Sequence, residues 1–259
     1  MFHFLTIAGF DNSGGAGLQA DIKIATLMGG MASTVATAFA LQNSQGVADV
    51  HHLPTAIIEK QLDLILQDSA LDVIKIGMLD CASHIHTISD LLRQYPRYPL
   101  ILDPVLVSSS GKLLLEPQGI DALKRLLCPQ TLCITPNIPE LACLTGRDII
   151  DDSSEQQAVQ DLLRYGVKSV LVKGGHRTDT DYAVDRLYES AKIYEYASPR
   201  FAYDVHGTGC ALSSLMACYI AQDYDLHDAV RYAKQKMHEL FQNPVAMTKG
   251  YYFHHHFRE

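Results

Sequence analysis

The sequence has no tryptophan, no CxxC pair among its six cysteines and no run of lysine or arginine. Without a CxxC pair, the cysteines do not suggest a zinc site, and five of them are interpreted as packed or surface thiols. The net charge of −8 and the lack of a basic run argue against a partner that is a nucleic acid.

Long apolar runs are missing as well. No run approaches the roughly 20 residues that a membrane-spanning helix needs, and residues 1–6 do not resemble a secretory leader. We therefore expect a cytoplasmic protein without a membrane partner. His254, His255 and His256 form a short tract, which we interpret as a solvated tail and not as a metal site.

The chain has 259 residues, 47% of them hydrophobic, which is enough to bury a sizeable core in one α/β domain over residues 1–259. Short apolar runs alternate with amphipathic stretches, a pattern typical of a mostly parallel sheet flanked by helices on both faces. Strands are predicted at residues 4–8, 31–41, 73–76, 100–102, 132–135 and 170–173, with a hairpin at 182–188 and 192–196. Helices are predicted at residues 18–28, 55–67, 84–94, 120–127, 141–144, 155–165, 210–221 and 226–241.

Polar or glycine-containing segments follow most of these strands. Gln42 and Asp103, for example, come directly after predicted strands, and Lys173 is the last residue of one. In an open parallel sheet, ligands bind beyond the carboxyl ends of the strands, so these residues should share one rim. The binding site is predicted to run along that rim.

Gly207, Thr208 and Gly209 form a short turn before an apolar stretch with helical spacing, so the turn should open a helix. The first N–H groups of a helix have no internal partners and favour negative charge. Cys210 lies in the predicted first turn, where the pKa of a thiol is expected to fall, and an ionised thiol could accept a proton from an attacking hydroxyl group. The alternative is a plain helix-starting turn with Cys210 as a small core residue.

An earlier glycine cluster, residues 15–20, fits the G-x-G-x-x-A fingerprint of dinucleotide-binding enzymes. That fingerprint also requires an acidic residue about 20 positions later, and this chain has Gln42 and Asn43 there. A kinase therefore agrees better with the sequence than an NAD-dependent oxidoreductase does.

Seven ordered motifs closely resemble the hydroxymethylpyrimidine/phosphomethylpyrimidine kinases of thiamine biosynthesis, which belong to the ribokinase-like superfamily. They lie at residues 8–21, 40–43, 75–79, 102–105, 135–140, 172–176 and 206–210. The chain departs from the family pattern at Asn12, Val205 and Ala211, and none of these changes removes a proposed catalytic atom. The resemblance implies a ribokinase-like fold, with ATP and Mg²⁺ as cofactors, and often a homodimer.

The resemblance also implies a reaction, in which ATP phosphorylates 4-amino-5-hydroxymethyl-2-methylpyrimidine and a second ATP phosphorylates the monophosphate. Cys210 matches the proton-accepting position, and Gly207, Thr208 and Gly209 match the anion hole. Charge stabilisation and positioning should then supply most of the rate.

On the substrate side, the resemblance implies that Gln42 contacts the edge of the aminopyrimidine. It also implies that Asp21 is a carboxylate on the substrate side of the site. Gly9 would let the ring approach the backbone, and Met78 would lie against its face. Each residue also has a structural interpretation: Gln42 could cap its strand, Asp21 could cap or pair within its helix, and Met78 could be core.

On the nucleotide side, Asn137 and Glu140 match an N-x-x-E element that is linked to organising Mg²⁺ through water, with Asp103 in the same charge network. Lys173 matches a lysine near the nucleotide phosphates, with Asn137 and Thr208 as further contacts. Pro139 favours a helix start, so Glu140 could instead be a capping residue, and Lys173 could simply be solvated. Pyridoxal kinase activity and a non-catalytic pyrimidine-binding protein are the alternative functions.

Overall fold

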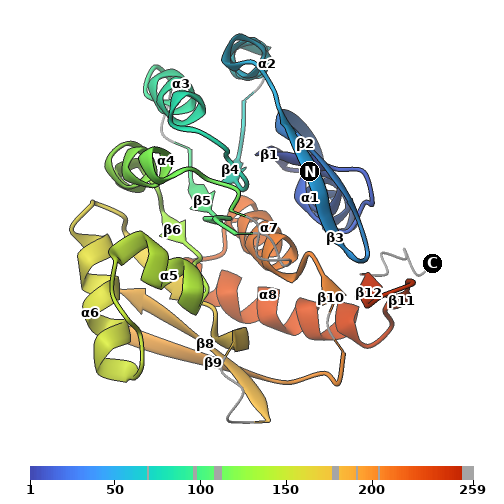
Figure 1. Ribbon diagram of the computed structural model, residues 1–259, viewed down its shortest axis with the longest axis vertical. Coiled ribbons are helices and arrows are strands. Elements are labelled where there is room, and N and C mark those ends of the chain that lie inside the picture. The colour runs from blue at the N-terminus through green and yellow to red at the C-terminus, as the bar shows by residue number, and fades with distance from the viewer. Residues whose placement is uncertain are drawn as a thin grey trace.

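The computed structural model describes residues 1–68, 70–95, 98–107, 113–176, 181–190, 192–203 and 205–252, so the histidine tract at 254–256 lies outside the described residues. A nine-stranded sheet with the order β3-β2-β1-β4-β5-β6-β7-β8-β9 forms its centre (Figure 1). The strands are β1 (His3–Asp11), β2 (Met31–Asn43), β3 (Gly46–His52), β4 (Val73–Ile76), β5 (Leu100–Leu102), β6 (Cys133–Ile134), β7 (Ser169–Val172), β8 (Tyr182–Glu189) and β9 (Lys192–Pro199).

The six central strands, from β2 to β7 in the sheet order, pair in parallel, while β3 at one edge and β8 and β9 at the other pair antiparallel. β4, β5, β6 and β7 are buried along their whole length, as expected for parallel strands covered on both faces. The predicted mostly parallel sheet is therefore confirmed.

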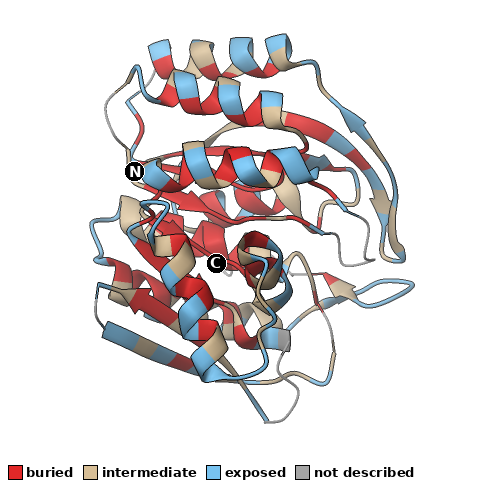
Figure 2. Ribbon diagram, turned by 60° about the vertical axis from the view of Figure 1, so that its left-hand side comes forward, coloured by how far each residue is buried: buried red, intermediate tan, exposed pale blue. Residues whose placement is uncertain are grey.

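Helices cover both faces of this sheet and give three layers (Figures 1 and 2). One core forms under α1 (Gly17–Leu27), α7 (Thr208–Ala221) and α8 (Leu226–Phe241). The other core forms under α2 (Thr55–Asp68), α3 (Ala82–Leu92), α4 (Pro117–Ala122), α5 (Ile138–Thr145) and α6 (Asp152–Leu163). In α2 the buried residues Ile58, Leu62 and Leu66 recur every four positions, which places one apolar stripe against the sheet.

The structure differs from the sequence prediction in three places. β3 was not predicted, because Gly46–His52 is a mostly exposed polar edge strand without a clear apolar alternation. The helix predicted at residues 120–127 is divided into α4, a π-helical turn at Leu123–Leu127 and a 3-10 turn at Cys128–Gln130. A small second sheet joins β10 (Val205–His206), β12 (Tyr251–Tyr252) and β11 (Val245–Ala246), and it too was not predicted.

Among the described residues, the helices are too short or too polar to cross a membrane.

Candidate active site

The sequence-predicted site residues lie along one edge of the sheet. Gly9 is near the end of β1, Gln42 is near the end of β2 and Met78 follows β4. Asp103 follows β5 directly, Asn137 and Glu140 follow β6, and Lys173 follows β7. Because these strands are parallel, their carboxyl ends meet at the same rim, as predicted.

The start of α7 reaches this rim. α7 packs against β1, β4 and β5 in the middle of the sheet. Gly207 is its N-cap, with a left-handed φ of 82°, and a Cβ at this position would lie 1.9 Å from the carbonyl oxygen of Gly15. Only glycine combines that backbone conformation with such close contact to the first loop.

The first turn of α7 has no side-chain cap, whereas Asn137, Asp151 and Asp225 cap α5, α6 and α8. Among the described residues, no side chain caps its first N–H groups, which lie at the positive end of the helix dipole. This is the arrangement that binds phosphate groups at helix termini.

Lys173 adds a positive charge beside this turn. A Cβ on Gly209 would lie 3.3 Å from Lys173 Nζ and 3.6 Å from Asp103 Oδ2. Lys173 Nζ is 2.8 Å from Asp103 Oδ1 and 3.6 Å from Glu140 Oε2. Asp103 also accepts hydrogen bonds from Thr135 and Ser213, both at 3.2 Å. The charge network expected around Asp103 is therefore present.

Asn137 and Glu140 form a capping box at the start of α5. Glu140 N–H donates to Asn137 Oδ1 at 2.8 Å, and Asn137 N–H donates to Glu140 Oε2 at 2.7 Å. The capping role left open for Glu140 is thus seen, and the same carboxylate also faces Lys173.

Burial and charge act together on the pKa values in this network. Burial would raise the pKa of Asp103, but the Lys173 and Lys75 ammonium groups hold it below its usual value. Burial raises the pKa of Glu140, and Lys173 offsets this only in part. Burial would lower the pKa of Lys173, and the two carboxylates raise it instead. Lys173 is therefore charged at every physiological pH.

Asp21 lies in a second buried network. It is 0% exposed and accepts hydrogen bonds from Lys75 Nζ at 2.9 Å, Thr6 Oγ1 at 2.6 Å and Ser214 Oγ at 2.7 Å. None of these partners belongs to its own helix, so the alternative of a cap or pair within α1 does not apply. Direct contact with substrate would require breaking these bonds, so the structure favours a positioning role for Asp21.

Cys210 lies between the two networks, within electrostatic range of Lys75, Asp21 and Asp103. Burial raises the pKa of the Cys210 thiol to about 11, although the Lys75 ammonium and the nearby Gly17 N–H oppose the rise. The expectation of a lowered thiol pKa is therefore wrong. Loss of water around the sulfur outweighs the helix terminus and the nearby ammonium.

Gly9 and Met78 lie next to each other, because a Cβ on Gly9 would lie 3.1 Å from Met78 Sδ. Met78 packs in a small buried cluster with Ala38 and Leu114, so it is also a core residue. Gln42 is half-buried, and its N–H donates to Asn12 Oδ1 at 2.8 Å. Within the described part of the chain, no hydrogen bond engages the side-chain amide of Gln42.

The first glycine loop is closed by Asp11, which is 2% exposed. Its carboxylate accepts hydrogen bonds from the N–H groups of Ser13, Gly15 and Ala16 at 2.7, 3.0 and 2.8 Å. Burial would raise the pKa of Asp11, but the nearby His206 and hydrogen bonds from Ser13 hold it well below its usual value. Since these amides already hold a carboxylate, the loop cannot bind a pyrophosphate as a dinucleotide fingerprint would.

Sequence reasoning missed several residues of the site. Lys75 has the clearest signal, because it is a lysine inside the otherwise apolar four-residue strand Val73–Ile76. A charged residue in a strand of that kind is expected to have a buried partner. Thr135, Ser213 and Ser214 gave no signal, because their hydroxyl groups find their partners only through tertiary contacts.

Comparison with known proteins identifies the family. A family model described as phosphomethylpyrimidine kinase matches residues 11–255. The chain belongs to the phosphomethylpyrimidine kinase family. It is 38% identical over 251 residues to the hydroxymethylpyrimidine/phosphomethylpyrimidine kinase of Haemophilus influenzae, covering 95% of this chain and 93% of that protein. The corresponding kinase of Bacillus subtilis is 32% identical over 252 residues, covering 97% and 93%.

A longer relative of the family is also similar. The thiamine biosynthesis bifunctional protein of Geobacter sulfurreducens is 42% identical over 232 residues, which cover 89% of this chain. The chain spans about half of the Geobacter sulfurreducens protein, because the match covers 47% of that protein's length.

Solved structures agree with this family assignment. The phosphomethylpyrimidine kinase of Clostridium difficile has a TM-score of 0.82 at 36% identity, covering 93% of this chain and all of that one. The pyridoxal kinase of Staphylococcus aureus, solved with AMP-PCP and pyridoxal, has a TM-score of 0.88 at 28% identity, covering 98% and 93%. The ribokinase-like α/β fold is thus confirmed, and nucleotide binding is seen in similar proteins.

Proposed function

We propose that this chain transfers a phosphoryl group from ATP to 4-amino-5-hydroxymethyl-2-methylpyrimidine, and a second one to the resulting monophosphate. The family and the seven ordered motifs support this pair of reactions. Identities of 36% to the Clostridium difficile phosphomethylpyrimidine kinase and 28% to the Staphylococcus aureus pyridoxal kinase favour the pyrimidine as substrate.

The contact made by Gly17 is the observation that supports a kinase site most directly. A Cβ on Gly17 would lie 2.2 Å from the carbonyl oxygen of Gly9, and the Gly17 N–H is close enough to the Cys210 sulfur to lower the pKa of the thiol. Gly17 therefore joins the early segment proposed to hold the pyrimidine to the late segment with the thiol. An alcohol bound beside Gly9 and Met78 would lie within reach of both Cys210 and the start of α7.

In the proposed mechanism, the thiolate form of Cys210 accepts the proton of the hydroxymethyl group while the hydroxymethyl oxygen attacks the terminal phosphorus of ATP, and ADP leaves. The N–H groups of Gly207, Thr208 and Gly209 hold the negative charge on the transferred phosphoryl oxygens, and the Lys173 ammonium stabilises the same charge. Gly9 and Met78 hold the ring, and the Gln42 amide pairs with its aminopyrimidine edge. Asn137 lies in the capping box beside the proposed phosphate position.

Glu140 and Asp103 fit a site for Mg²⁺ next to the phosphates. Two buried carboxylates share a single ammonium group there, which leaves a surplus negative charge that a hard cation with bound water would balance. A bound Mg²⁺ would neutralise charge on the ATP phosphates during transfer. The protein residues would hold it through water, because Lys173 and Asn137 already occupy carboxylate oxygens.

A coupled assay of ADP release tests the proposal with the hydroxymethylpyrimidine and its monophosphate as separate substrates. ATP-dependent turnover that stops when Mg²⁺ is removed and returns when it is added back is the expected result. No turnover on either compound by folded protein would reject the pyrimidine assignment. A pyrimidine-binding protein without activity would be recognised by calorimetric binding of the pyrimidine in the absence of turnover.

Pyridoxal kinase activity is the second candidate, favoured by the TM-score of 0.88 to the Staphylococcus aureus enzyme. Both substrates are six-membered heteroaromatic alcohols, so the comparison must use kcat/KM for the two alcohols under one set of conditions. A higher kcat/KM for pyridoxal would replace the main proposal with this one.

A further inference from the structure

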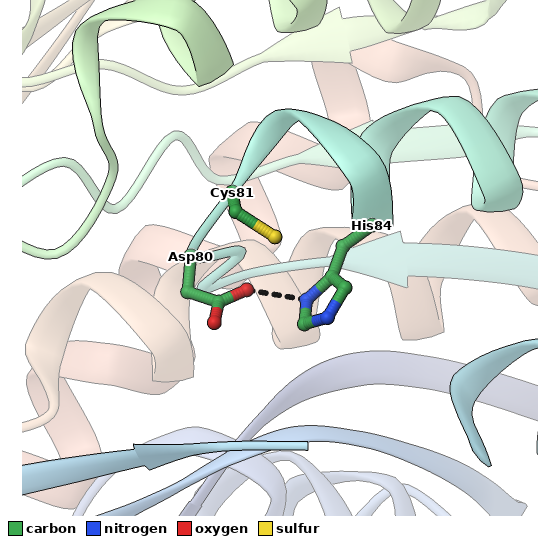
Figure 3. A group of neighbouring side chains, drawn as sticks. All are labelled: Asp80, Cys81 and His84. Atoms are coloured by element: carbon green, nitrogen blue, oxygen red, sulfur yellow. Dashed lines mark ion pairs between the residues drawn. The ribbon is translucent and has the colours of Figure 1, made fainter. Parts of the chain in front are cut away.

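A group of nitrogen, oxygen and sulfur donors lies where β4 continues into α3. Asp80, Cys81 and His84 each offer one ligand atom, and these atoms all lie within 4.8 Å of one another (Figure 3). Asp80 and His84 are buried, with 2% and 3% of their side chains exposed, whereas Cys81 is half-buried. None of the three belongs to the catalytic site described above.

The buried pair of this group has an unusual arrangement. His84 Nε2 is 2.9 Å from the carbonyl oxygen of Leu53, which can only accept, so this nitrogen holds the ring proton. The other nitrogen, Nδ1, faces Asp80 Oδ1 as an ion pair, yet neither atom has an aligned hydrogen-bond partner among the described residues (Figure 3). In a neutral ring, two lone pairs would face each other, which requires a positive charge between them.

Hydrogen bonding of one histidine nitrogen to a backbone carbonyl is also how metal-binding histidines are held. It fixes the tautomer and directs the lone pair of the other nitrogen at the metal. Leu53 holds His84 in this way, so Nδ1 is directed at the Asp80 carboxylate.

His52 reaches the same carboxylate from a different part of the chain. It is the last residue of β3, and its Nδ1 pairs with Asp80 Oδ2. Its side chain is 59% exposed, so this donor can move and solvent can reach the group from that side. Two imidazoles, a thiol and a carboxylate make a donor set typical of tetrahedral zinc.

We propose that Asp80, Cys81, His84 and His52 bind a divalent transition-metal ion of the zinc type. The sequence prediction of no zinc site depended on CxxC spacing, and it could not detect an Asp-Cys-x-x-His group completed by a histidine from another strand. His52 pairs with Ala38 across β2 and β3, and Ala38 packs against Met78. The metal would therefore fasten β3 to the segment that continues from the proposed pyrimidine pocket.

Titration of the full-length chain with Zn²⁺, and with Co²⁺ as a spectroscopic substitute, tests this proposal. Co²⁺ should produce a thiolate charge-transfer band in the near ultraviolet, and Cys81→Ser should remove the band. The same variant should weaken Zn²⁺ binding by about 10-fold or more, because it removes a ligand. Cys143→Ser is the matched control, since Cys143 is an exposed thiol on α5, and it should change neither result.

Co²⁺ bound only by histidines elsewhere in the chain would not produce the charge-transfer band, because the band requires a thiolate ligand. A band that persists in Cys81→Ser, or equal Zn²⁺ affinity of Cys81→Ser and the parent protein, would overturn the proposal. Either result would leave Asp80 and His84 as a buried ion pair without a metal ion.

Thermal unfolding gives a second measurement that does not depend on Cys81. Zn²⁺ should raise the Tm of the parent protein by about 2 °C or more, and Mg²⁺ should not. His84→Gln should lose the shift, whereas His86→Gln, an exposed histidine on the same helix, should keep it. An equal shift in the His84→Gln protein would contradict the assignment even if that variant is less stable.

Discussion

Lys75 and Asp21 form an ion pair, with 2.9 Å between Nζ and Oδ2, in which both side chains are 0% exposed. Burial would lower the pKa of Lys75, but Asp21 raises it, so the pair is charged. The two residues are 54 positions apart, and both affect the pKa of the Cys210 thiol. This pair therefore connects the stability of the fold to the chemistry proposed for the site.

Lys75→Met should lower the free energy of unfolding by about 3–5 kcal/mol, because it leaves a buried carboxylate without its counter-charge. Urea denaturation measures the effect, and Lys60→Met on the exposed face of α2 is the control. The double variant Lys75→Met with Asp21→Asn should recover much of the loss. A single variant as stable as the parent protein would show that the carboxylate is not charged.

Cys210→Ala should keep pyrimidine binding and lower kcat by about 10²-fold or more, the usual effect of removing a general base. Steady-state kinetics and calorimetric binding separate the two quantities. Cys143→Ala, which removes an exposed thiol, is the matched control and should behave like the parent protein. Unchanged turnover in Cys210→Ala would exclude the thiol as the base, and lost pyrimidine binding would indicate a structural defect.

The pKa of the Cys210 thiol predicts how the rate depends on pH. Because the pKa is raised to about 11 from the ordinary 9.0, the free protein contains little thiolate at neutral pH. With Mg²⁺ and ATP saturating, kcat/KM for the pyrimidine should increase by up to about tenfold per pH unit below that pKa. The residual activity of Cys210→Ala should lack this increase, and a flat profile in the parent protein would contradict thiolate catalysis.

The same pKa shift also affects stability, with a definite sign. Folding favours the neutral thiol, so its contribution to stability is full below pH 9.0 and is lost as pH rises toward about 11. The difference in unfolding free energy between the parent protein and Cys210→Ala should therefore shrink over this range.

Lys173→Ala should lower kcat by about 10²- to 10³-fold, because it removes a positive charge aimed at the developing phosphoryl charge. Lys168→Ala, which changes an exposed lysine directly before β7, is the control. Circular dichroism should accompany the kinetics, since Asp103 and Glu140 also lose their shared counter-charge. A folded Lys173→Ala protein with parental kcat would show that this ammonium does not contact the phosphates.

Gln42→Ala should raise KM for the pyrimidine by about tenfold, because it removes hydrogen bonds to the ring without touching the nucleotide. KM for ATP should stay unchanged in the same variant. Gln45→Ala, an exposed glutamine in the turn between β2 and β3, is the matched control. An equal rise in both KM values would indicate that the change distorts the rim and does not remove a ring contact.

The order of the elements and the shared rim could be predicted from the sequence, because both depend on local patterns. Apolar runs of three or four residues indicate buried parallel strands, and glycine or polar residues mark where each strand ends. The edge strand β3 could not be found in this way, since its exposed polar residues have no local signature.

The sequence by itself thus determined the family, the α/β layers and the rim along which the proposed site residues lie. Only the tertiary structure decided that Asp21 is buried against Lys75, that Asp11 occupies the amides of the first glycine loop and that the thiol pKa rises. The physical reason is that hydrogen-bond partners and desolvation depend on which distant segments meet, and no local pattern records that.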